Sequence, residues 1–199
     1  MVKDVLLGIA GAVTATVAVL GLRSWHRELH GKANFEVARS LARASYKMRD
    51  EIQLARSPLI RGNEFPEGYR NNLGLTKRDP ENEANAYAYV YANRMKTVWE
   101  ALQDFDAQSL EAEALWGTTI RTCTNELRTI LQTLNAAQEA FIANVKAGGA
   151  DFKMDQDFGK KILLEVSSSP TSLENPLNIS LNAAIRSLEN ALRPHLRRA

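Results

Sequence analysis

The chain has 199 residues, with 25 Lys or Arg, 23 Asp or Glu and a formal net charge of +2. This length suits one ordinary domain, and so small a net charge disfavours a general polyanion-binding protein. No nucleic-acid recognition motif is present. The single cysteine, Cys123, excludes an intramolecular disulfide and a cysteine-cluster zinc site. Its place on an apolar helical stripe predicts a small core residue.

The first predicted element is an uncharged run from Val5 to Leu22. At about 1.5 Å per residue, such a helix crosses most of a hydrocarbon layer that is about 30 Å thick. Cations follow the run more densely than they precede it, which places the N-terminus outside and the bulk of the chain in the cytoplasm. We therefore expect a single-pass protein of the inner or plasma membrane, with residues 1–30 as anchor and interfacial flank. A cleaved signal peptide and a buried helix are the two alternatives.

Two sets of residues near the anchor have expected roles. Small residues at close helical spacing allow helices to approach in lipid. They predict a transmembrane packing face made of Gly8, Gly11, Ala12 and Ala15. Residues just beyond the run are expected to contact lipid headgroups: Arg23, Trp25, Arg27 and Lys32.

Residues 31–199 are predicted to form a cytosolic helical bundle. An apolar stripe over residues 33–56 predicts a helix, which Pro58 ends. The stretch 57–80 is rich in proline and glycine and predicts a long irregular loop. This loop is either a partner-binding element or a connector that lies over the bundle.

Residues 81–147 contain no proline and carry two heptad-like stripes that join with a phase slip near Trp116. A coiled coil can absorb such a slip, so we favour one continuous or kinked helix. The alternative is a hairpin whose second helix is capped by Asp104 or Asp106. Gly148 and Gly149 are expected to end this region.

The segment 162–166 is too short to assign as helix or strand. After it, Pro176 suits the start of a final amphipathic helix. The stripes together predict an all-α fold, an elongated antiparallel bundle with coiled-coil-like heptads. The expected packing core comprises Leu41, Met48, Ile52, Tyr91, Met95, Val98, Leu102, Trp116, Ile120, Leu127, Ile130, Leu134, Phe141, Leu181, Ile185, Leu188 and Leu192.

The candidate chemistry is weak. His26 and His30 share a helix face at a spacing that suits a metal, but no third ligand is evident. The acidic cluster Asp151, Asp155 and Asp157 lacks the ligand spacing of a calcium loop. No phosphate loop or dinucleotide fingerprint is present. We expect no catalytic residue, metal or cofactor, and no enzyme activity.

Charge is unevenly distributed along the chain, since residues 23–61 carry a net +5 and residues 62–161 a net −4. The functional hypothesis is a membrane-anchored helical scaffold that holds a partner protein, or another copy of itself, at the cytosolic face. The alternative is a signalling or stress-response effector whose bundle rearranges on a stimulus. Neither nucleic acid nor a small-molecule substrate is an expected partner.

Overall fold

The chain folds into helices joined by short connections. The computed structural model describes the backbone of residues 2–71 and 79–196; inside this range, the side chains of residues 2, 4–10, 12, 13, 15, 70 and 71 are not described. The elements are α1 (Val2–Ala55), a 3-10 turn η1 (Gly62–Glu64), α2 (Glu67–Asn71), α3 (Pro80–Trp116), α4 (Thr118–Lys146), α5 (Ala150–Met154), α6 (Gln156–Val166) and α7 (Pro176–Leu196). The described residues contain no strand, which confirms the all-α prediction.

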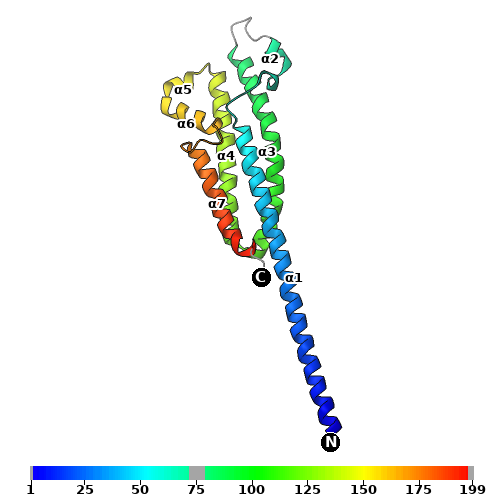
Figure 1. The fold of residues 1–199 in the computed structure, drawn as a ribbon. Helices are drawn as coiled ribbons and strands as arrows, with labels where there is room; N and C mark the ends of the chain where they lie inside the picture. The colour runs from blue at the N-terminus through cyan, green and yellow to red at the C-terminus, as the bar shows by residue number, and fades with distance from the viewer. Residues whose placement is uncertain (1, 72–78, 197–199) are drawn as a thin grey trace.

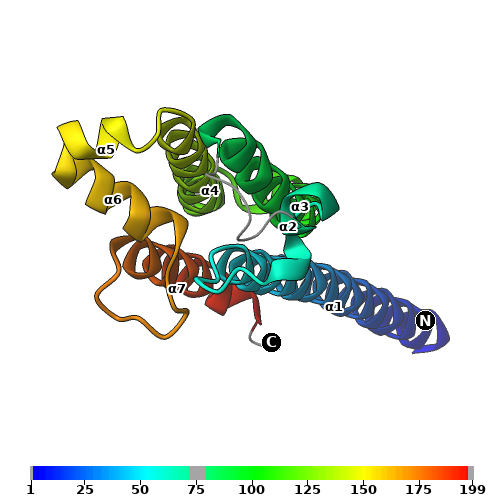
Figure 2. The same ribbon diagram turned by 90° about the horizontal axis from the view of Figure 1, so that it is seen from above.

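Four helices form an antiparallel bundle. Helices α1, α3, α4 and α7 run alternately up and down, and each contacts the next around a closed ring (Figure 1). Seen from above, α5 and α6 lie to one side, against α4 and α7 (Figure 2). The heptad stripes of one chain therefore pack against each other, because each helix turns an apolar face to the centre.

The structure places the predicted packing residues in the core of this ring, except that Tyr91 and Phe141 belong to a second cluster. Of that set, Leu102, Trp116 and Phe141 are partly buried and the others are buried. Cys123 is also buried, at 7% exposure. A second, smaller cluster joins Tyr91 on α3 and Ala137 on α4 to Ile162 and Val166 on α6. The unassigned segment 162–166 is therefore helical, and its apolar residues attach α6 to the bundle.

The predicted continuous helix over 81–147 is wrong, because the chain reverses at Gly117. This single residue separates α3 from α4, with φ 73° and ψ −147°. Only glycine adopts that conformation readily, since it has no Cβ. The expected alternative caps, Asp104 and Asp106, instead lie within α3. The phase slip near Trp116 marks the corner of a hairpin.

Polar side chains and glycines define the other helix ends. The Asp79 carboxylate accepts a hydrogen bond from the Asn82 amide at 3.4 Å, and Pro80 occupies the first helical position of α3. At the start of α7, the side-chain oxygen of Asn175 accepts a hydrogen bond from the backbone N–H of Asn178 at 3.1 Å. The predicted stop after α4 is present, where Gly148 and Gly149 have φ of 64° and 81°. These ends follow the usual capping chemistry.

The lower part of α1 extends far beyond the bundle (Figure 1). We call residues 2–33 the arm. The arm continues into the bundle as one helix, without a break at Gly31. Every arm side chain described from Thr16 to Ala33 is exposed.

The expected membrane anchor requires a correction. Over the side chains that the structure describes, none of the helices offers an apolar stretch of the length and hydropathy that spans a membrane. A span needs about 20 mostly apolar residues, whereas the described apolar stretch from Thr16 stops before Arg23. This finding contradicts the predicted single-pass localisation at the inner or plasma membrane.

Candidate functional site

The residues predicted to act at a membrane all lie on the arm. Arg23, Trp25, Arg27 and Lys32 are exposed there. Gly11 is also exposed, and a Cβ built on it would meet no atom within 4 Å. The side chains of Ala12 and Ala15, and any neighbours of Gly8, lie outside the described set. Of the predicted transmembrane packing face, Gly11 is therefore the one residue whose surroundings the structure describes, and no atom lies against it.

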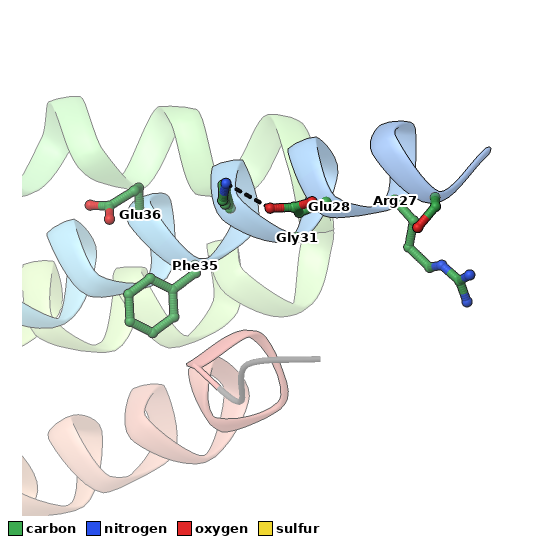
Figure 3. A pocket seen from close by; sticks show the side chains of 7 residues that line it. Arg27, Glu28, Gly31, Phe35 and Glu36 are labelled. Carbon is green, nitrogen blue, oxygen red and sulfur yellow. Dashed lines mark ion pairs between the residues drawn. The ribbon is translucent and has the colours of Figure 1, made fainter. Parts of the chain in front are cut away.

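A groove lies where the arm leaves the bundle. It has a volume of about 890 Å³, and its described lining comes from α1: Ser24, Arg27, Glu28, Gly31, Lys32, Phe35 and Glu36. In Figure 3, Phe35 points from α1 toward the chain's C-terminal helix, whereas Arg27 points away from the bundle. Glu28 and Lys32 form an ion pair of 2.8 Å. The hydrogen bond and charge of Lys32 lower the pKa of Glu28. This pair is exposed on both sides, so it contributes little stability.

The histidine pair on the arm forms no metal centre with other side chains. The rings of His26 and His30 stack with centroids 6.0 Å apart, and Trp25 meets His26 edge-on at 6.5 Å. Within residues that the structure describes, no three His, Cys, Asp or Glu side chains are grouped to hold a metal ion. The spacing predicted from the sequence therefore brings these two rings together without a third ligand.

A buried arginine ties α1 to the segment that joins α6 and α7. Arg56 is 1% exposed. Its Nε donates to the Glu165 carbonyl at 2.7 Å, and Nη2 donates to the Leu164 carbonyl at 2.9 Å. The same guanidinium donates to the side-chain oxygens of Asn175 and Asn178. Its acceptors are thus neutral oxygens, two of them at the C-terminal end of α6, where the helix dipole favours a cation.

Burial lowers the pKa of Arg56 to about 10, and the nearby Glu165 charge opposes that shift. The group therefore stays protonated at neutral pH. Asn178 continues the network, since its side-chain Nδ2 donates to the backbone carbonyls of Ser169 and Ser172 at 2.9 and 3.1 Å. Arg56 is a structural clamp whose donors are occupied by the chain itself.

A second arginine fixes the segment after α1. Arg94 on α3 donates to the carbonyls of Ser57 and Leu59 at 2.7 and 2.8 Å, and its Nε lies 2.6 Å from the Glu64 carboxylate. The hydrogen bond from Arg94 is the main cause that lowers the pKa of Glu64. The first part of the predicted loop 57–80 is therefore held on the bundle. Residues 72–78 lie outside the described residues.

Sequence reasoning missed both arginine clamps. Neither residue lies in a motif, because their acceptors are carbonyl, amide and carboxylate oxygens up to 122 positions away. The only signal was local: Asn175 before Pro176 reads as a helix start, with the asparagine as cap. No pattern in the sequence indicates that the same asparagine also binds Arg56.

Comparison with known proteins identifies no relative of this chain: no protein-family model matches it, and neither a curated protein nor a solved structure does.

Proposed function

We propose that this chain is a non-enzymatic helical interaction protein, whose bundle holds the arm out to bind a partner protein. The observation that carries the proposal is the arm itself. It bears large apolar side chains that are mostly exposed, such as Leu20 at 59%, Trp25 at 59% and Val17 at 64% exposure. A contiguous exposed apolar surface of this kind is typical of an interaction site.

The apolar arm residues do not form a single narrow stripe. At about 100° per residue, Val19, Leu22 and Leu29 fall on one side of the helix and Val17 and Leu20 on the other. A helix that is apolar around its whole circumference is stable when other elements surround it. This favours a binding mode in which the partner encloses the arm.

The bundle supports the proposal as a rigid base. Its four helices close a ring, and the Arg56 clamp ties both ends of the α6–α7 connection to the end of α1. Because the arm and one wall of the bundle belong to the same unbroken helix, the arm has a fixed direction. The bundle therefore sets where the arm begins and the direction in which it leaves.

Site-specific photocrosslinking in the native cell tests this proposal. A photoreactive residue at Leu20 or Leu29 should yield a defined crosslinked product, because both side chains are exposed on the arm. The matched position is Glu126, exposed on the outer face of α4. We expect no product from that position.

A second form of the chain that lacks residues 1–22 provides the pull-down control. Recovery of the same protein by the intact chain alone supports the proposal. Equal recovery by both forms, or crosslinking from Glu126 and not from the arm, contradicts it.

A further inference from the structure

Two rows of opposite charge lie on the neighbouring helices α1 and α3. Arg39, Arg43 and Lys47 follow one another at four-residue steps on α1 and are exposed; we call them the basic row. The acidic row is Glu100, Asp104 and Glu111, which are exposed on α3. Four-residue and seven-residue steps keep side chains on one face of a helix.

Neither row is neutralised inside the chain. The ion pairs found over the described residues do not include any member of the basic row or the acidic row. The other two carboxylates in this part of α3 are paired with α4, Asp106 with Arg128 at 2.8 Å and Glu113 with Arg121 at 2.9 Å. The acidic row therefore points away from α4, on the flank of α3 that leads toward α1.

The vertical positions of the two rows match. Arg94 donates to the Ala55 carbonyl at 3.4 Å, which places these two residues within one arginine side-chain length of a common level. At about 1.5 Å per residue, Lys47 lies about 12 Å below that level, between Glu100 at about 9 Å and Asp104 at about 15 Å. Arg43 lies at about 18 Å; Arg39, at about 24 Å, is level with Glu111 at about 25 Å.

We propose that this α1–α3 face binds a second copy of the chain, about a two-fold axis parallel to the helices. Such an axis preserves height and places α1 of each copy over α3 of the other. Each basic row then meets the acidic row of the other copy at the same level. An interface of this kind is self-complementary, as two-fold symmetry requires.

Other residues on the face agree with the same arrangement. At the upper end of each row the sign of the charge reverses. Lys96 lies four residues before Glu100 on α3, and Glu51 lies four residues after Lys47 on α1, at a similar level. Apolar contact area is available beside the basic row, where Leu54 is 65% exposed. Exposed apolar side chains supply affinity, and the charges supply register and specificity.

The charge pattern favours a second copy over a polyanion. The acidic row would repel phosphate groups that approach the basic row beside it. A two-fold dimer pairs both rows at once. It also sends both arms out in the same direction, so the dimer would present two arms side by side.

Charge reversal of each row in the full chain tests this assignment. In the first variant Arg39, Arg43 and Lys47 become Glu, and in the second Glu100, Asp104 and Glu111 become Lys. Each variant alone should be monomeric by sedimentation equilibrium, with the dimer dissociation constant raised at least about 100-fold, because every facing pair becomes like-charged. An equimolar mixture should form a heterodimer, since each reversed row then meets its opposite.

A control variant carries Glu126→Lys and Glu139→Lys on the exposed face of α4 and should dimerise like the parent chain. Circular dichroism of every variant reports whether the bundle has folded. Dimerisation of the parent chain that is lost in each variant and restored in the mixture supports the proposal. A monomeric parent chain, a dimer that survives either reversal, or folded variants that do not associate when mixed would overturn it.

Discussion

At the scale of single residues, Arg56 and Gly117 decide how the helices are joined. Arg56 is the one charged side chain that is buried in the described part of the chain. Gly117 forms a complete helix-to-helix reversal in one residue. Both residues fix the path of the chain between helices, and neither belongs to an apolar stripe.

Replacing Arg56 with methionine should lower the free energy of unfolding by about 1–3 kcal/mol. Methionine fills part of the volume but leaves the oxygens of Asn175 and Asn178 without their donor, and a buried unsatisfied acceptor is costly. Arg56→Lys should recover only part of the loss, because an ammonium group cannot reproduce the guanidinium fork. Urea unfolding measures the free energy of unfolding of both variants. Arg121→Met, at a side chain 63% exposed, is the control; a loss of equal size there would contradict the clamp.

Gly117→Ala should destabilise the chain by about 1–3 kcal/mol, because a Cβ strains the positive-φ conformation of the corner. The matched control is Gly31→Ala, where the backbone is helical and no atom lies within 4 Å of the added Cβ. Alanine favours a helix over glycine by about 1 kcal/mol, so that variant should lose no stability. Thermal unfolding followed by circular dichroism compares the two. Equal effects would show that the corner tolerates a side chain.

At the scale of elements, aromatic contacts attach the two ends of the hairpin α3–α4. At the upper end, Tyr91 and Tyr87 each meet Phe141 edge-on, with centroids 5.9 and 5.2 Å apart. At the corner, Trp116 stacks on His195 at 4.0 Å and holds the end of α7. Edge-to-face and stacked pairs of this kind add about 0.5–1.5 kcal/mol beyond area burial.

Tyr91 gives the fold a dependence on alkaline pH. Burial is the main cause that raises the pKa of Tyr91 from 10.0 to about 12. The unfolded chain therefore loses this proton first, and the free energy of unfolding should fall as pH rises from 10 to 12, by about 2–3 kcal/mol. Unfolding of the parent chain and of Tyr91→Phe across this range gives the difference. A parallel fall in both would show that Tyr91 is not the cause.

His195 makes the stability of the fold depend on pH in mild acid, where stability falls as the pH is lowered. Burial lowers the pKa of His195 below its ordinary value of 6.5. The unfolded chain takes up the proton first, so stability should fall as pH drops through 6.5 toward the folded-state pKa. His195→Phe keeps an aromatic partner for Trp116 and removes the titration. The parent chain should lose more stability than this variant between pH 7 and pH 5; identical pH profiles would contradict the assignment.

At the scale of the whole molecule, the arm and the bundle differ in how they are stabilised. The bundle buries one continuous apolar core, whereas the described arm residues from Thr16 to Ala33 bury none of their side chains. From Thr16 to Ala33 the arm is therefore a helix with little tertiary support, and such segments open at low free energy.

Removing residues 1–32 should leave the free energy of unfolding of the bundle unchanged within about 0.5 kcal/mol, since surface changes away from packing sites have effects of this size. Urea unfolding of both chains, at a concentration below self-association, is the measurement. A large loss in the truncated chain would show that the arm contributes to the core. Trypsin gives an independent check, and its first cuts should fall after Arg23, Arg27 or Lys32.

Sequence patterns predicted the helices better than the connections. The stripes at Leu41, Leu127 and Leu188 imply helices with one apolar face, and the structure buries these residues at its centre. The hairpin at Gly117 could not be chosen over a continuous helix, because a phase slip is compatible with both a stutter and a reversal. The anchor prediction failed for a different reason. It rested on the length of one apolar run and on the cations that flank it, and the described side chains do not supply a membrane-spanning length.

The sequence by itself determined that the chain is helical, that helices end near Pro58 and Gly148, that one begins at Pro176, and which residues face inward. These properties depend on local periodicity and capping, which act over a few residues. Only the tertiary structure decided that the stripes pair within one chain, that Arg56 and Arg94 bind distant carbonyls, and that a basic and an acidic row lie level on adjacent helices. The physical reason is that pairing and register depend on contacts between segments far apart in the chain, which the turn at Gly117 brings together.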